Sequence, residues 1–369
     1  MDLIKRLNNS YNTSVQSDGK DNMWTDWIVP KLKNTLNGNL KRSGGSTPEV
    51  PLNLLQFNLE NPSKNYLCFG FDDMHQDSSI KNYNDVLIYN NTIRECLLRL
   101  CASVGITRFN NPEGGELPQT QTDNIETLLL KLDTYFGFTI DFPNIFDTSP
   151  EFNWLFYINY HSDLVDAGII TEIDATNHYN NYGKNENRLI NGEIGLPSSR
   201  GIIKLRSVHS LHFISRIKEL SKKYQISSIL EIGGGMGRNA YYAKKLGIKK
   251  YIIVDIPSTC LMSGYYLGRT LGEVTLNNET TDNYAHIVNT VDDHKVDLIF
   301  QSDGLTEMGL ENSKKYLDFG KIAPLFLSIN HEANKYTVRD LYTEMGIPCI
   351  YRNISWYRDG YIEELLKLS

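Results

Sequence analysis

The sequence predicts an α/β protein with a doubly wound sheet in its C-terminal part and a mostly helical N-terminal part. A short apolar strand runs into a glycine-rich turn and a helix at 228–247, and a second strand at 250–255 ends in an acid. Strands and helices then alternate to the end of the chain. Since 369 residues suit about two domains, we expect an accessory domain over 1–195 and a ligand-binding domain over 196–369.

Composition excludes several classes of protein. The chain is 40% hydrophobic and 22% charged, which is ordinary for a globular protein. A net charge of -7 and a pI near 5.7 argue against a nucleic-acid partner, because phosphate binding usually needs a basic face. The five cysteines include no C-x-x-C pair, which favours reduced thiols and offers no zinc site. With no signal peptide and no membrane span in the pattern, we expect a cytoplasmic protein without a membrane partner, either monomeric or homo-oligomeric.

The N-terminal elements are predicted from apolar spacing and breakers. Helices are expected at 23–32, 86–104 and 123–137, with Glu126 in capping-box register for the last. The polar stretch 161–191 is predicted to be irregular, either a lid or a surface excursion. Glycine and proline make 192–201 the best linker by composition.

The C-terminal elements alternate in type. Helices are expected at 204–223, 238–247, 258–270, 284–291, 312–319 and 337–345. Strands are expected at 228–232, 250–255, 273–277, 296–303, 325–330, 347–354 and 361–368. These strands make a seven-stranded sheet, whose last two strands are separated by Arg358-Asp-Gly360.

The glycine spacing indicates which ligand the first turn takes. A dinucleotide fingerprint would need a third glycine at Arg238, whereas the chain has the pattern acid-x-G-x-G-x-G over Glu231, Gly233, Gly235 and Gly237, with Gly234 also in the turn. This pattern resembles motif I of class I S-adenosylmethionine-dependent methyltransferases, whose ligand has no pyrophosphate. An acid at the tip of the second strand, Asp255, stands where nucleotide-binding folds hold ribose hydroxyls.

Further candidates come from the rule that ligands bind beyond the carboxyl ends of parallel strands. The cofactor candidates at these ends are Glu231, Gly233, Gly234, Gly235, Gly237, Asp255, Ile256 and Ser302. The candidates on the acceptor side are Asp303, Glu307, Asn330, His331 and Glu332.

Methyl transfer to an oxygen needs alignment of the nucleophile and removal of its proton. His331 is the natural base because its ordinary pKa lies near neutrality, and Glu332 could hold its tautomer or bind the acceptor. A hydrogen-bonded loop histidine is an equally weighted interpretation, and Asp303 and Glu307 are alternative bases. Asp303, Asn330 and Glu332 could instead supply oxygen ligands to Mg²⁺, which stays open at this point.

Several segments resemble the bacterial family of putative sugar O-methyltransferases, over the chain from about residue 128 onward. They are Asp141-Phe-Pro-Asn144, Gly195-Leu-Pro-Ser-Ser-Arg-Gly201, the glycine motif, Val254-Asp-Ile-Pro257, Thr306-Glu-Met308, Ser328-Ile-Asn-His-Glu332 and Trp356-Tyr-Arg-Asp-Gly-Tyr361.

The resemblance implies a Rossmann-like class I methyltransferase sheet, S-adenosylmethionine as donor and a sugar, nucleotide sugar or glycosylated metabolite as acceptor. Two other function classes remain open. One is an N-methyltransferase of a small molecule or peptide, although Ser302-Asp-Gly-Leu305 is not the Asn/Asp-Pro-Pro-Tyr pattern of DNA amino methylation. The other is a non-catalytic scaffold with a methyltransferase fold.

Overall fold

The computed structural model describes most of the chain from residue 82 onward. The described ranges are 82–106, 124–143, 152–190, 194–255, 257–277, 279–288, 294–306, 309–318 and 322–369, with residues 3, 5–7, 9, 10, 13, 80 and 192. The chain divides into two compact units, one of residues 1–39 and 210–369 and one of residues 40–209. The predicted helix at 23–32 and the candidates Ile256 and Glu307 lie outside the described residues. The domain boundary predicted at residue 196 stays a prediction.

The unit of residues 40–209 contains helices whose starts are fixed by side-chain caps. Its main helices are α4 (Tyr83–Ser103) and α5 (Ile125–Phe136), as the spacing predicted. Asn82 and Asp85 form a reciprocal capping box at the start of α4, and Asn124 caps α5. Glu126 is not part of a capping box: its carboxylate accepts bonds from the backbone N–H and the hydroxyl of Ser199.

Two segments of this unit also differ from their predicted conformation. The stretch predicted to be irregular forms α7 (Ser162–Asp166), α8 (Glu172–His178) and the π-helix η5 (Tyr179–Gly183), preceded by α6 (Trp154–Tyr160). The predicted linker forms the hairpin of β1 (Leu196–Ser198) and β2 (Gly201–Ile203). The hairpin is fixed by partners far away in the sequence, because Arg200 pairs with Asp133 at 2.7 Å and its carbonyl accepts from the amide of Phe142.

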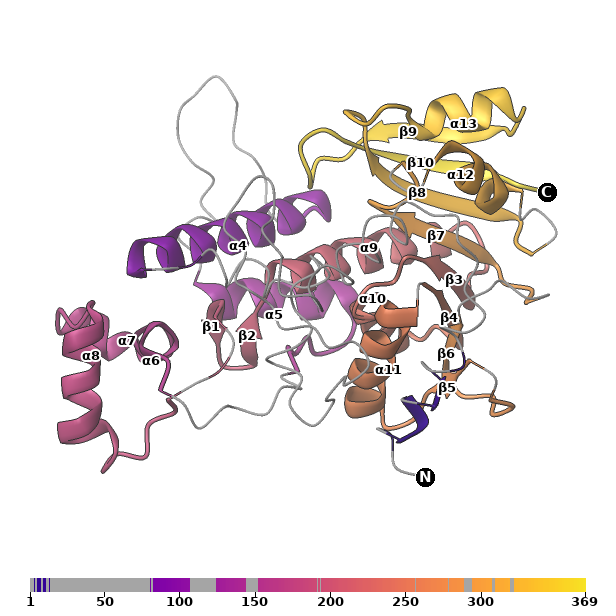
Figure 1. Cartoon of the computed structure of the whole chain (residues 1–369). Coiled ribbons are helices and arrows are strands. Elements are labelled where there is room, and N and C mark those ends of the chain that lie inside the picture. The colour runs from indigo at the N-terminus through magenta and orange to yellow at the C-terminus, as the bar shows by residue number, and fades with distance from the viewer. Residues whose placement is uncertain are drawn as a thin grey trace, which may run out of the picture. The chain divides into compact units, whose positions relative to one another are not determined.

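The unit of residues 210–369 is built on one large sheet (Figure 1). Its strands are β3 (Ser228–Ile232), β4 (Lys250–Val254), β5 (Thr275–Leu276), β6 (Ala285–Val288), β7 (Leu298–Ser302), β8 (Leu325–His331), β9 (Cys349–Ile354) and β10 (Tyr361–Lys367). Their spatial order is β5-β6-β4-β3-β7-β8-β10-β9. Only β10 runs antiparallel to its neighbours β8 and β9, and the other pairs are parallel.

The fold class is therefore the predicted one, a doubly wound, Rossmann-like α/β sheet, but the described residues form eight strands of it rather than seven. The additional strand, β6, occupies the stretch that we expected to be helical. All four of its residues are buried and pair with β4, and His286 and Ile287 also pair with β5. A strand of four buried residues shows no alternation of apolar and polar residues, so its sequence cannot be distinguished from that of a buried helical segment.

Helices lie on both faces of this sheet. The helices are α9 (Leu205–Ser221), α10 (Arg238–Leu246), α11 (Pro257–Leu271), α12 (Leu310–Leu317) and α13 (Val338–Glu344). Leu317 of α12 and Leu341 of α13 pack in one core with Phe326 of β8. On the opposite face, the ring of Phe213 from α9 stacks on that of Phe300 at a centroid distance of 3.5 Å. All of these predicted helices are confirmed, within a few residues.

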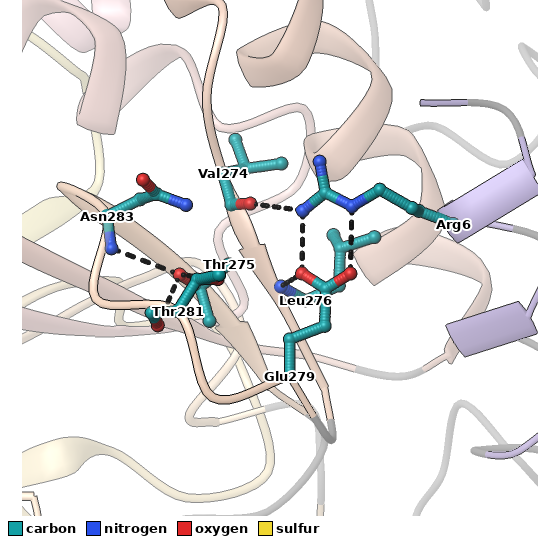
Figure 2. A network of polar contacts seen from close by, with 7 residues as sticks. All are labelled: Arg6, Val274, Thr275, Leu276, Glu279, Thr281 and Asn283. Atoms are coloured by element: carbon teal, nitrogen blue, oxygen red, sulfur yellow. Dashed lines mark hydrogen bonds and ion pairs between the residues drawn. The ribbon is translucent and has the colours of Figure 1, made fainter. Parts of the chain in front are cut away.

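The β5 edge of the sheet is covered by residues from the N terminus (Figure 2). Arg6 donates to both carboxylate oxygens of Glu279, at 2.8 and 2.6 Å, and to the carbonyl of Val274 at 2.6 Å. The same carboxylate accepts from the amide of Leu276. Unpaired backbone groups at a sheet edge can pair with other chains. Here the carbonyl of Val274 and the amide of Leu276 have side-chain partners instead.

Replacing Arg6 by methionine should lower the free energy of unfolding by about 1–2 kcal/mol, because it removes charge-assisted hydrogen bonds from a partly buried carboxylate. Thermal unfolding measured against the wild type would check this. An unchanged Tm would contradict the packing of the N-terminal residues on β5.

Candidate functional site

The turn after β3 depends on glycine. Gly233, Gly235 and Gly237 have φ of +77°, +55° and +82°, in the left-handed region that other residues adopt only with strain. Gly237 also precedes the first residue of α10, and no side chain caps this helix. The turn therefore brings backbone N–H groups and the positive end of a helix to the carboxyl end of β3.

The remaining glycine of the turn is required by close packing. A Cβ at Gly234 would lie 2.7 Å from the Cγ2 atom of Ile253 in β4, which is too close for any side chain. A Cβ at Gly233 would meet no described atom within 4 Å. The backbone at Gly234 thus packs against the sheet, while Gly233 adjoins open space in which a ligand could approach the backbone.

Asp255 follows β4 directly and reaches this turn. Its carboxylate accepts a hydrogen bond from the amide of Gly235 at 3.1 Å, and its own amide donates to the carbonyl of Val288 at 3.2 Å. The predicted pair of a glycine turn and an acid therefore comes together at the carboxyl ends of two neighbouring strands. A carboxylate in this place can accept bonds from vicinal hydroxyls.

Glu231 lies beneath the turn and is fully buried. Its two carboxylate oxygens accept bonds from the amide group of Asn239 at 2.6 Å and from the hydroxyl of Tyr251 at 2.9 Å. Burial raises the pKa of Glu231 from its ordinary 4.5 to about 7, although both hydrogen bonds act to lower it. Because both oxygens have partners in β4 and α10, we interpret Glu231 as a support of the turn.

Asp303 stands at the end of β7, after the predicted cofactor residue Ser302, which the structure places at the last position of the strand. Its backbone adopts a left-handed φ of +69°, which is uncommon for a residue other than glycine. Its carboxylate is held by Arg358, whose Nη1 lies 2.9 Å from both oxygens. Arg358 also donates from Nη2 to the hydroxyl of Tyr361 at 2.6 Å.

His331 ends β8, and its ring is bonded at Nδ1 and lies close to Gly360 at Nε2. Its Nδ1 accepts a hydrogen bond from the amide of Ala333 at 2.9 Å, so the proton of the neutral ring belongs on Nε2. A Cβ at Gly360 would lie only 2.6 Å from Nε2. With Nδ1 bonded to Ala333 and the proton on Nε2, the neutral ring has no lone pair available to take a proton from a substrate hydroxyl. This favours the interpretation of His331 as a hydrogen-bonded loop histidine.

Two of the three candidate metal ligands, Asp303 and Glu332, are paired with arginines. Glu332 pairs with Arg352 at 2.5 Å, and Asp303 pairs with Arg358. Asn330 is buried; its Nδ2 donates to Oε1 of Gln301 at 2.6 Å, while its Oδ1 has no hydrogen-bond partner among the described residues. In the described part of the chain, no three His, Cys, Asp or Glu side chains are grouped as a metal site.

Sequence reasoning missed Arg358 and Tyr361. From the sequence, the Arg358-Asp-Gly360 segment is interpreted as the separator of the last two strands and as part of the family resemblance, without a role for either side chain. The strand order supplies what the sequence lacked. Because β10 lies between β8 and β9 and runs antiparallel to them, the turn before β10 lies at the carboxyl ends of the parallel strands.

Among the described residues, no helix combines the length and apolar character needed to cross a bilayer.

Comparison with known proteins gives matches to solved structures alone. No protein-family model and no curated protein sequence matches the chain. A SAM-dependent methyltransferase from Aquifex aeolicus is 16% identical with a TM-score of 0.32, over 42% of this chain and 89% of that one. Magnesium protoporphyrin IX methyltransferase from Synechocystis, solved with bound SAM, is 15% identical with a TM-score of 0.33, over 52% and 92%.

A putative RNA methyltransferase from Pyrococcus horikoshii is 15% identical with a TM-score of 0.30, over 43% of this chain and 81% of that one. Likeness at this level identifies neither an activity nor an acceptor for this chain. Both have to come from the chemistry of the site.

The raised pKa of Glu231 makes stability depend on pH. Between about pH 4.5 and about pH 7 the folded state holds a proton that the unfolded state releases, so this group's contribution to stability falls as pH rises. The free energy of unfolding of Glu231→Gln minus that of the wild type should therefore increase from about pH 4.5 to about pH 7 and stay constant above it. Thermal unfolding of both proteins against pH checks the sign; a Tm difference that does not change with pH would contradict it.

Proposed function

We propose that this chain is an S-adenosylmethionine-dependent methyltransferase acting on a hydroxyl group. The observation that carries the proposal is the left-handed glycine turn whose Gly235 amide bonds to Asp255, at the carboxyl ends of β3 and β4. Such a turn suits a nucleoside without a pyrophosphate, because it offers backbone N–H groups and a carboxylate but lacks the third glycine of the dinucleotide pattern.

The residues present fit this cofactor. Gly233 would allow close approach of the ligand to the backbone, and Asp255 would accept bonds from the ribose hydroxyls. When bound, the cofactor supplies a methyl group on a sulfonium centre. The remaining tasks of the protein are to align the acceptor oxygen and to take its proton.

Asp303 is the base that this geometry favours. It ends the strand next to β3 in the sheet, and its carboxylate is partly exposed. His331, the base first expected, has its Nδ1 lone pair occupied by the amide of Ala333. Glu332 follows β8, which lies one strand farther from β3 than β7 does, and like Asp303 it pairs with an arginine. Asp303 would accept the proton of the acceptor hydroxyl, and His331 would support the neighbouring turn.

A sugar hydroxyl is the acceptor that the sequence favours. This rests on the segments that resemble the putative sugar O-methyltransferases, including Trp356-Tyr-Arg-Asp-Gly-Tyr361. Trp356 is 84% exposed in the turn between β9 and β10, where an aromatic ring could contact a sugar. An amine acceptor and a non-catalytic scaffold remain the alternatives. A need for Mg²⁺ is disfavoured because the carboxylates of Asp303 and Glu332 are already paired with arginines.

Replacing Asp255 by alanine should weaken S-adenosylmethionine binding by at least about tenfold, because bonds to a charged acceptor are worth roughly 1.5–3 kcal/mol. Isothermal titration calorimetry of the cofactor measures this directly. Asp318→Ala, at the exposed end of α12, is a matched control that should bind like the wild type. Equal affinities of all three proteins would contradict the role of Asp255.

The two candidate bases can be separated by kinetics. Asp303→Asn should lower kcat by about a hundredfold or more, the usual effect of losing a general base, while cofactor affinity is kept. His331→Asn should lose much less. Transfer of a radiolabelled methyl group to a panel of nucleotide sugars and hydroxylated metabolites supplies the assay. A full loss in His331→Asn with normal turnover in Asp303→Asn would reverse the assignment.

A further inference from the structure

The turn between β9 and β10 closes over the ends of β7 and β8. Tyr361, the first residue of β10, pairs with His331, the last residue of β8. The amide of Glu332 donates to the carbonyl of Gly360 at 3.1 Å, and the amide of Ser355 donates to the carbonyl of Tyr361 at 2.9 Å. These bonds bring a segment from near the end of the chain to the proposed acceptor side of the site.

Arg358 occupies the centre of this turn. Its Nη1 contacts both carboxylate oxygens of Asp303, and its Nη2 donates to the hydroxyl of Tyr361. The guanidinium carbon also lies 3.6 Å from the centroid of the Tyr361 ring. A planar cation that pairs with a carboxylate while stacking on an aromatic ring has little freedom to move, which is the arrangement that arginine favours over lysine.

The backbone of Asp303 needs such a restraint. Its left-handed φ of +69° persists only if the surroundings impose it. One restraint is the bond from its own amide to the carbonyl of Ile329 at 3.2 Å, and the other is the ion pair with Arg358. The first fixes the main chain and the second fixes the direction of the carboxylate.

The turn itself is buttressed by His331. Gly360 has a φ of +79°, and a Cβ there would lie only 2.6 Å from Nε2 of His331. The same ring meets Tyr361 edge to face at a centroid distance of 5.1 Å. The contacts therefore run from His331 to Tyr361, from Tyr361 to Arg358, and from Arg358 to Asp303.

We propose that Arg358 is a positioning residue for the transfer reaction: it holds the Asp303 carboxylate in the direction needed to take the acceptor proton. The inference rests on the proposed function. It assigns to the C-terminal hairpin a part in the chemistry, although Arg358 itself would touch neither cofactor nor acceptor. Misplacing a catalytic group by about 1 Å can cost roughly a hundredfold in rate.

The first test compares two arginine variants. Arg6 with Glu279 and Arg358 with Asp303 are ion pairs of similar exposure, 21% with 26% and 18% with 31%. Both Arg6→Met and Arg358→Met should lower Tm. Only Arg358→Met should lower kcat, by about a hundredfold, with the Kd of S-adenosylmethionine and the KM of the acceptor nearly unchanged. Arg358→Lys should fall between Arg358→Met and the wild type, because one ammonium replaces only part of the guanidinium contacts.

Other outcomes are equally informative. Wild-type kcat in Arg358→Met, or an equal fall of kcat in Arg6→Met, would overturn the proposal, since either result makes the ion pair merely structural. A double-mutant cycle of Arg358→Met with Asp303→Asn, followed by thermal unfolding, needs no acceptor; strictly additive losses would also overturn it. If the wild type binds no S-adenosylmethionine, the proposed function fails instead, and the role of Arg358 fails with it.

Discussion

The left-handed backbone of the glycine turn is the constraint on which the site depends. Three positions of positive φ fold the chain back at the end of β3, and this turn presents the amide of Gly235 to Asp255. Beneath it, the buried carboxyl of Glu231 connects α10 to β4 through Asn239 and Tyr251. A side chain at any of these glycines would cost strain or a clash, so the geometry of the turn and the position of the carboxylate are set together.

A second constraint comes from the antiparallel strand. Because β10 lies between β8 and β9, the hairpin of β9 and β10 is joined to the parallel strands by backbone pairing, and side chains on other elements can hold it further. Arg216 of α9 makes a two-nitrogen contact with Glu363, which also accepts from Tyr351, while Arg358 reaches Asp303 at the site. Removing Arg216 would leave the Glu363 carboxylate, whose side chain is only 6% exposed, without its counter-charge, which is destabilising. The hairpin therefore connects the scaffold to the proposed acceptor side.

Local signals in the sequence were sufficient for most of the fold and for the meeting of the glycine turn with Asp255. The glycine turn, Asp255 and the alternation of helices and strands depend on neighbouring residues, and all were predicted. What was missed depends on distant partners: β6 is defined by pairing with β4 and β5, and the β1–β2 hairpin by Asp133 and Phe142. In the same way, the engagement of His331 by Ala333 and Gly360 depends on a turn that no periodicity reveals.

The most direct test of this account is a crystal structure of the chain with S-adenosylhomocysteine bound. We predict that the nucleoside lies along the turn from Gly233 to Gly237, with its ribose hydroxyls on the carboxylate of Asp255 and its sulfur directed toward Asp303. A ligand bound elsewhere, or a turn left empty at saturating ligand while its conformation is intact, would contradict the proposal that this turn binds the methyl donor.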